Sequence, residues 1–291
     1  TADNDDAILQ GGTGDDTFVF SGTNGLQTAA DSSGTGDQID GGNGEDTIEL
    51  DNSNGAVTAS TTLGVASAAA TTFGVENIVV ANANGGDTVN ADAISLTLDS
   101  AADNGTDDTD QNVKVDASVI TDTNDTVTVN ASAVLEEDIV LDITGGAAND
   151  TLTGGAAGDT INGGGGDDTI DGDAGADELT GGAGSDDFLY DLSSVGSTSA
   201  ATDTVTDFLA GTDNIQVTHT TAGNVDFTDK GDATSIADGL SLLSGTVGEY
   251  FFNTGSNQLV MDVDGNGLIQ SGDLVVNLSD ETGFSSADMD T

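Results

Sequence analysis

The sequence predicts an all-β protein: a right-handed parallel β-solenoid in which an irregular β-helix runs into a tighter, metal-bound roll and ends in a C-terminal β cap. Three observations predict it. Nine-residue repeats rich in Gly and Asp occur in tandem, short alternating runs of Val, Ile, Leu and Thr are typical of strands, and 42 Gly residues make long helices unfavourable. We therefore expect stacked short strands joined by tight turns.

The charge balance limits the partners of the chain. Its 291 residues include 53 acidic ones and only two basic ones, Lys114 and Lys230, so the formal net charge is −51. Nucleic acid and anionic membranes are bound through clusters of Lys and Arg, and we exclude both as partners. We also expect no membrane insertion, because no long apolar run occurs. Carboxylates at this density favour disorder unless cations neutralise them.

The composition also argues against an enzyme. The chain has no Cys, and its one His, His219, lies in the segment VTHTT without an HExxH or GxSxG motif around it. These residues provide no thiol nucleophile and no Cys/His zinc site. Pairs of acidic residues are so frequent that their proximity indicates no glycosidase chemistry. We expect no catalytic residue.

The N-terminal half is predicted to contain two segments. Residues 1–55 hold two isolated repeat-like units, GGTGDDTFV at 11–19 and GGNGEDTIE at 41–49, whose sixth residues are Asp16 and Asp46. Residues 56–144 lose the repeat but keep short apolar runs, which predict an irregular parallel β-helix. The separation of 18 residues from Ile78 to Leu96 predicts a coil of about two repeat units there.

Residues 145–189 are five consecutive nonapeptides, GGAANDTLT, GGAAGDTIN, GGGGDDTID, GDAGADELT and GGAGSDDFL. Each unit has Asp at its sixth position and an apolar residue at its eighth. The Gly-rich part suits a tight turn, and the last three residues suit a strand whose eighth side chain points inward. Two units then form one flattened coil, and stacking places Asp carboxylates and turn carbonyls about 4.8 Å apart. Such oxygens repel one another unless a hard cation lies between them, which favours calcium over magnesium.

These units resemble the repeats-in-toxin (RTX) family of calcium-binding proteins exported by type I secretion, whose consensus nonapeptide is GGxGxDxUx. The resemblance implies that each calcium ion sits between the turn of one unit and the turn two units later, so that five units hold about three or more ions. The implied ligands are Asp16, Asp46, Gly145, Ala147, Asp150, Gly154, Ala156, Asp159, Gly163, Gly165, Asp168, Gly172, Ala174, Asp177, Gly181, Ala183 and Asp186. Three residues depart from the consensus, Ala148 and Ala157 at fourth positions and Asp173 at a second position, and we expect looser calcium binding at these turns.

Residues 190–291 are expected to form a capping and secretion-signal region. The segment DTVTDFLAGTDNIQV, residues 203–217, resembles the join that follows the roll in serralysin-type secreted proteins. Its apolar residues Val205, Phe208, Ile215 and Val217 predict a strand, a turn and a second strand that cover the last coil.

The segment DVDGNGLIQSGD fits the spacing of an EF-hand loop between two strands. It predicts one calcium site, with candidate ligands Asp262, Asp264, Asn266, Leu268, Gln270 and Asp273. Asp273 stands where the pattern has a bidentate Glu, which weakens the site. A plain Asp/Gly hairpin turn is the alternative interpretation.

Three functions fit this sequence. The first is a structural protein of the cell exterior, a surface-layer or filament subunit that assembles with calcium, because FGVENIVV and VNASAV followed by GGAANDTLTGG resemble RTX surface-layer proteins. The second is the C-terminal RTX folding and secretion module of a larger type I-secreted enzyme or adhesin, and the third is an adhesin stalk or ligand-binding module. The implied cofactor is Ca²⁺, and the implied location is extracellular, on the bacterial cell surface. The implied partners are other copies of the chain, the type I secretion machinery and a cell-surface glycan.

Overall fold

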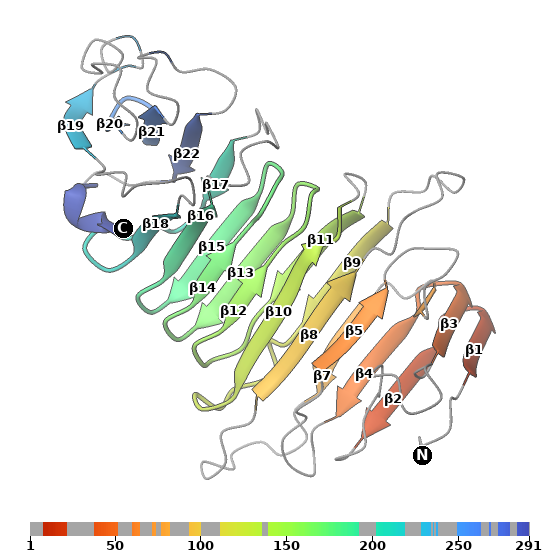
Figure 1. Ribbon diagram of the computed structural model, residues 1–291. Coiled ribbons are helices and arrows are strands. Elements are labelled where there is room, and N and C mark those ends of the chain that lie inside the picture. Colours follow the sequence, from red (N-terminus) through yellow and green to blue (C-terminus); the bar gives the residue numbers. More distant parts are fainter. Residues whose placement is uncertain are drawn as a thin grey trace.

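A computed structural model describes most of the strands and turns of the chain (Figure 1). The described residues are 8–21, 38–51, 60–64, 72–73, 77–81, 93–99, 111–135, 139–191, 202–218, 228–233, 235, 237, 249–262, 268, 273–279 and 284–290. Nearly all of them form strands and tight turns, as the sequence predicts. The chain is a parallel β-solenoid that starts at β1 and ends in a cap at the opposite end (Figure 1).

Two long sheets and one short sheet contain the described strands. The longest has the order β19 (Thr228–Ala233), β20 (Glu249–Asn253), β21 (Gln258–Asp262), β22 (Leu274–Leu278), β17 (Asp203–Val205), β15 (Glu178–Ala183), β13 (Thr160–Gly165), β11 (Ile139–Thr144), β9 (Gln111–Asp116), β7 (Asn77–Ala81), β4 (Thr47–Asp51) and β2 (Thr17–Ser21). The second has the order β23 (Met289–Asp290), β18 (Asn214–Thr218), β16 (Asp187–Asp191), β14 (Thr169–Asp171), β12 (Thr151–Thr153), β10 (Thr126–Ala133), β8 (Ala93–Asp99) and β5 (Ser60–Gly64). The short sheet contains β1 (Ile8–Thr13), β3 (Gln38–Asn43) and β6 (Thr72–Phe73).

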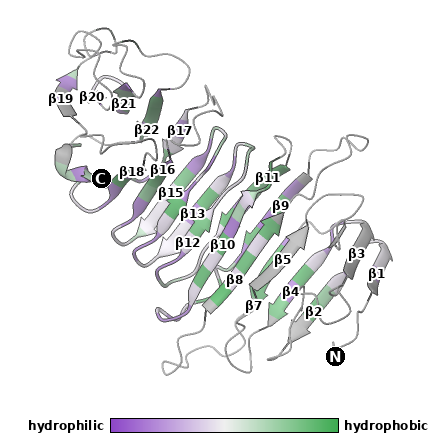
Figure 2. Cartoon of the chain, in the orientation of Figure 1, coloured by the Kyte–Doolittle hydropathy of each residue, from purple (hydrophilic) through white to green (hydrophobic). Residues whose placement is uncertain are grey.

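The eighth residue of every tandem unit faces one continuous apolar core. Leu152, Ile161, Ile170, Leu179 and Phe188 are all completely buried. They alternate between the two long sheets, so side chains from both sheets fill the same interior. Figure 2 shows the result, with apolar residues along the strands and hydrophilic residues at the turns of the roll. The inward orientation predicted for the eighth position is therefore confirmed.

The length of a coil changes along the solenoid. In the tandem repeats, Ile161 pairs with Leu179 and Ile170 with Phe188, so each coil takes the predicted 18 residues. In the N-terminal half, Ile78 pairs with Val115, 37 residues further on. The prediction of an 18-residue coil there is wrong, because Ile78 in β7 and Leu96 in β8 lie in different sheets. That spacing is half a coil, since the turns of this region are longer.

The two N-terminal units are neighbours in space although they are isolated in the sequence. β2 pairs with β4 in parallel, and Thr17 lies opposite Thr47. β4 in turn pairs with β7, and β11 pairs with β13. The long sheet therefore passes through both of the segment boundaries expected at residues 55/56 and 144/145.

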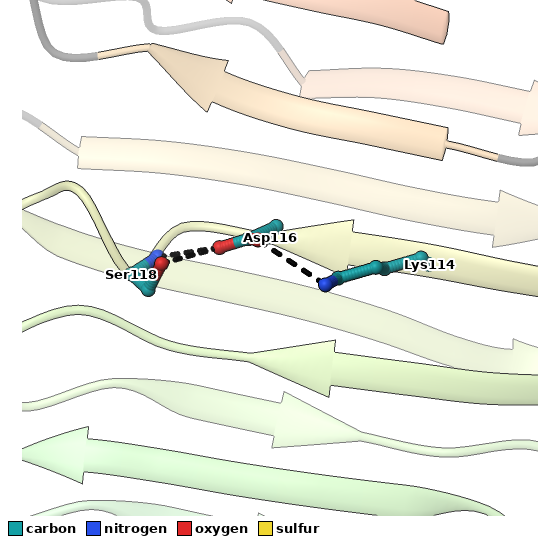
Figure 3. Close-up of polar contacts among 3 residues, drawn as sticks. All are labelled: Lys114, Asp116 and Ser118. Atoms are coloured by element: carbon teal, nitrogen blue, oxygen red, sulfur yellow. Dashed lines mark hydrogen bonds and ion pairs between the residues drawn. The ribbon is translucent and has the colours of Figure 1, made fainter. Parts of the chain in front are cut away.

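Two turns before the tandem repeats are closed by side chains of the protein itself. Asp116 Oδ1 accepts hydrogen bonds from the Ser118 amide at 3.0 Å and the Ser118 hydroxyl at 2.6 Å. These bonds lower the pKa of Asp116, and Lys114 Nζ lies 3.4 Å from its Oδ2 atom (Figure 3). Asn130 accepts the same pair of bonds from Ser132 in the next half-coil. The segments VKVDASVI and VTVNASAV thus form matching turns on opposite sheets.

The C-terminal region covers the last coil of the roll. Val205, Phe208, Ile215 and Val217 are buried, which confirms the predicted capping face. A row of aromatic contacts continues outward: Phe188 contacts Phe208 with ring centroids 6.2 Å apart, Phe208 contacts Phe284 at 5.9 Å, and Phe284 stacks on Phe252 at 5.4 Å. β22 and β23 then add one more strand each beside β17 and β18. A 3₁₀ helix, η2 (Ser286–Asp288), precedes β23, and no helix among the described residues is long and apolar enough to cross a membrane.

Leu141 and Leu135 provide a matched test of this core. Leu141 in β11 is fully buried, whereas Leu135 is 72% exposed. We expect Leu141→Ala to lower the free energy of unfolding by about 2–5 kcal/mol, because it leaves a cavity between the sheets, and Leu135→Ala to change it by less than about 0.5 kcal/mol. Urea denaturation in saturating calcium measures both, and equal losses would contradict the described core.

Candidate metal-binding turns

The sixth-position aspartates form two columns along the roll. Asp150, Asp168 and Asp186 stand in one column, Asp159 and Asp177 stand in the other, and all five are at most 2% exposed. In each column the Oδ1 atom of one Asp accepts a hydrogen bond from the backbone amide of the Asp one coil earlier, at 2.7 to 2.9 Å. The columns are therefore ladders that hold one acidic group per turn in line with the next.

The second oxygen of these carboxylates meets a carbonyl of the following coil. A Cβ atom placed on Gly163 would overlap both the Oδ2 atom of Asp168 and the carbonyl oxygen of Gly181. Gly145 and Gly154 have the equivalent pairs, Asp150 with Gly163 and Asp159 with Gly172. The first residue of these units must therefore be Gly, and the space beside it is lined by a carboxylate oxygen and a carbonyl oxygen. Such oxygens are the ligands that calcium takes in proteins.

The residue at the fourth position decides what the Oδ2 atom contacts. In the unit 163–171, Gly164 and Gly166 have φ of +102° and +104°. Ala148 and Ala157 occupy the fourth position of the first two units, where a side chain makes such a backbone unfavourable. These two turns instead direct the amides of Gly146 and Gly155 onto Asp150 and Asp159, at 2.6 and 2.7 Å. Two carboxylates of the roll are thus already bonded within their own turns.

Asp168 and Asp177 carry oxygens that the protein leaves without a partner. The Oδ2 atoms of both residues are buried and accept no hydrogen bond. Burial raises the pKa of Asp168 to about 8, with further contributions from the charges of Asp150 and Asp186. Burial also raises the pKa of Asp177 to about 8, and Asp203 and Asp159 add to the shift. An orphaned anionic oxygen beside a carbonyl fits a hard cation, so the residues present suit calcium.

The third-position residues lie at the edges of the turns. The Ala183 carbonyl accepts a hydrogen bond from the Gly166 amide at 2.8 Å, one coil earlier. The Ala174 amide donates to Gly155, and the Ala156 amide donates to Val134. The Gly165 amide donates to the carbonyl of Gly146 in the first unit, Ala147's neighbour. The predicted third-position residues therefore hold adjacent turns together through their backbones.

Both columns continue into the cap, which the sequence analysis missed. Asp203 accepts a hydrogen bond from the Asp177 amide at 3.0 Å, and Asp213 accepts one from the Asp186 amide at 3.1 Å. Asp213 also accepts from the Leu209 amide, four residues earlier, as Asp150 does from Gly146. Residues 208–216, FLAGTDNIQ, are a degenerate nonapeptide with Gly at the fourth position, Asp at the sixth and Ile at the eighth. That spacing was the available signal.

The N-terminal units repeat the ladder on a longer coil. Asp16 donates its amide to Asp46 Oδ1 at 2.8 Å, and Gly12 and Gly14 have φ of +106° and +104°. The Oδ2 atom of Asp16 is buried and accepts no hydrogen bond. This pair of predicted ligands therefore has the geometry of the tandem units with fourth-position Gly.

The predicted EF-hand-like loop joins two antiparallel strands. Met261 in β21 pairs with Leu274 in β22, so the strands expected on both sides of the loop are present. Asp262 is buried at the end of β21, Asp273 directly precedes β22, and Leu268 is 59% exposed. Asp264, Asn266 and Gln270 lie outside the described residues, as does His219. The loop therefore stays a predicted calcium site.

No group of three or more His, Cys, Asp or Glu side chains gathers into a metal-holding cluster in the part of the chain that the structure describes. The turns of the roll offer a different kind of site, in which one carboxylate per turn is combined with backbone carbonyls. A calcium ion bound there would neutralise the stacked carboxylates.

The comparisons with known proteins agree with this geometry. A family model for the RTX calcium-binding nonapeptide repeat, in four copies, matches residues 142–170 and 153–188. No curated protein matches the chain. The match confirms the resemblance of the tandem units to RTX repeats, which bind calcium and are typical of secreted proteins.

Opening the first turn tests the role of the fourth position. We expect Ala148→Gly to lower the calcium concentration at the folding midpoint by about threefold to tenfold, because the Gly146 amide no longer has to occupy Asp150. Ala147→Gly, the control in the same turn, should raise the midpoint slightly through chain entropy alone. Calcium titration followed by circular dichroism measures both. A midpoint that rises in Ala148→Gly would contradict this role.

The raised pKa values of Asp168 and Asp177 predict an acid-stabilised fold in chelator. An Asp in an unfolded chain titrates near pH 4, about 3.9, whereas these two titrate at about 8 in the folded state. The folded state therefore binds more protons between about pH 4 and pH 8, so its stability falls as pH rises through this window. Calcium displaces these protons, and its midpoint concentration should fall over the same pH range. Circular dichroism in chelator and in calcium buffers at pH 5 and pH 8 measures both trends, and a midpoint independent of pH would contradict them.

Proposed function

We propose that this chain, whose residues 142–188 are RTX calcium-binding repeats, is a structural protein of the cell exterior that folds on meeting calcium and assembles with other copies of itself into a surface layer or filament. One observation carries the proposal. The roll holds buried carboxylate oxygens of Asp168 and Asp177 without partners, in a chain with 53 acidic and two basic residues. Only a cation from the surroundings can neutralise them at neutral pH.

Calcium supply would control folding. Where free calcium is scarce, the stacked carboxylates repel and favour the unfolded chain, which suits export through a narrow channel such as the type I secretion machinery. Outside the cell, each site adds about 2.7 kcal/mol when calcium is at a hundred times its dissociation constant. Several such sites together reach the stability of a typical domain, about 5–15 kcal/mol. Folding and calcium binding then occur as one event.

The described architecture supports a structural role over a catalytic one. From β2 to β18 the solenoid is a continuous stack of short strands around an apolar core, and the turns carry carboxylates and backbone carbonyls. We propose that the chain has no catalytic activity and that its partners are further copies of itself, with a cell-surface glycan as a candidate anchor.

A second candidate function is that of a C-terminal RTX folding and secretion module of a larger type I-secreted enzyme or adhesin. The observation that favours it is the order of the parts, because the matched repeats are followed by a cap in which Asp203 and Asp213 continue both columns. Such a module would fold in calcium and remain monomeric.

Electron microscopy of the full chain, with circular dichroism on the same samples, separates the two functions. In millimolar calcium we expect ordered sheets or filaments and a β spectrum, and in chelator neither. Asp168→Asn should raise the calcium requirement for both, because it removes a buried anionic oxygen, whereas Asp142→Asn on the exposed face of β11 should not. Folded monomers in calcium would favour the secretion module, and a β spectrum that persists in chelator would overturn both functions.

A further inference from the structure

Tyr190 occupies the position at which a sixth tandem unit would begin with Gly. The five units start at Gly145, Gly154, Gly163, Gly172 and Gly181, and the next residue in this series is 190. Phe188 in β16 pairs with Ile170 in β14, so Tyr190 follows the register of Gly172. Its side chain is only 8% exposed. A large phenol therefore lies inside the solenoid where the repeats have no side chain.

The Tyr190 hydroxyl lies buried among acidic groups. It has no hydrogen-bond partner. Burial raises the pKa of Tyr190 well above its usual value, and the charges of Asp203, Asp177 and Asp171 add to the shift. A buried hydroxyl normally finds a partner, and its absence marks a place where a ligand is missing from the bonding. The hydroxyl is thus aimed at the last carboxylates of the second column.

Asp177 and Asp203 are the carboxylates at that place. Asp203 Oδ1 accepts the Asp177 amide at 3.0 Å, and the Asp177 Oδ2 atom is buried without a partner. The two carboxyl groups interact directly, which raises the pKa of Asp177 further. Two buried carboxylates in contact require a positive charge between them, either a proton or a cation.

No basic side chain can supply that charge. The chain contains two basic residues, Lys114 and Lys230. Lys114 pairs with Asp116 at 3.4 Å in β9, and Lys230 pairs with Glu249 at 2.9 Å at the junction of β19 and β20. The pair at the end of the roll therefore depends on the solvent for its counter-ion.

We propose that Asp177, Asp203 and the Tyr190 hydroxyl hold a divalent cation of the calcium class at the junction of the roll and the cap. All three groups present oxygen, and the two carboxylates match the charge of one such ion. The site differs from the repeat turns, because it uses a phenol and because Asp203 lies outside the matched residues 142–188. Its ion would fasten β17, and with it the cap, to the fourth unit. The proposal rests on the calcium dependence of the proposed function but concerns different residues.

Terbium luminescence tests the site directly. Tb³⁺ takes the same oxygen ligands as Ca²⁺ and emits when a nearby tyrosine passes on absorbed light, and this chain has only two tyrosines and no Trp. We expect emission from the full-length chain that calcium displaces. Tyr190→Phe should lose most of it, and Tyr250→Phe, with its change in β20, should retain it.

The acidic residues provide a second pair of variants. Asp203→Asn keeps both tyrosines and removes one carboxylate of the site, so emission and terbium affinity should both fall. Asp213→Asn is the matched control, because Asp213 accepts the amide of the last Asp of the other column at 3.1 Å. Circular dichroism in calcium shows whether each variant is folded, and only folded variants are compared.

The outcomes separate this site from the proposed function. Emission that is unchanged in both Tyr190→Phe and Asp203→Asn would overturn the site, and so would a wild-type chain that folds in calcium but shows no tyrosine-excited emission, since the pair would then share a proton. Either result leaves calcium-dependent folding in place. A chain that folds without calcium and binds no terbium would overturn the site and the proposed function together.

Discussion

Repulsion between stacked carboxylates is the constraint on which the rest of this structure depends. The roll repeats one Asp per nine residues, and its fold places successive members of each column one coil apart, with each carboxylate bonded to the amide of the coil before it. Hydrogen bonds from amides satisfy one oxygen of each group but do not cancel its charge. The tight 18-residue coil is therefore a geometry that protein atoms alone cannot neutralise, and its stability is tied to the ions around it.

The N-terminal half solves the same turning problem with side chains. Asp116 and Asn130 each close a turn by accepting two bonds from a Ser two residues later. The coils there are longer, because turns of this kind do not reverse the chain as tightly as a Gly-rich turn around a cation. Ile120 and Val134, which follow these turns, lie directly against Gly146 and Gly155 of the first two tandem units. The part of the solenoid closed by hydrogen bonds thus adjoins the part that awaits an ion.

The tandem repeats could be predicted in detail, because their periodicity fixes both the face and the register of each residue. The eighth-position core, the 18-residue coil and the capping face of Val205, Phe208, Ile215 and Val217 follow from spacing alone. The coil length around Ile78 could not be predicted, because apolar runs 18 residues apart fit either a whole coil or half of one. The pairing of Asp16 with Asp46, and the roles of Asp203, Asp213 and Tyr190, depend on which strands the chain brings together across long connections. The consensus departure at Ala148 was visible, but its effect on Asp150 required the path of the backbone.

The amide-to-carboxylate ladders also have a direction. Every link runs from the amide of one coil to the carboxylate of the next coil toward the C-terminus, and the last acceptors, Asp203 and Asp213, belong to the cap. Each turn is therefore oriented by the coil that follows it, although the chain is synthesised in the opposite order. The roll is a vectorial structure whose template lies at its far end. Order in it is set from the cap inward, and the last part of the chain to be made is the part that aligns the first repeats.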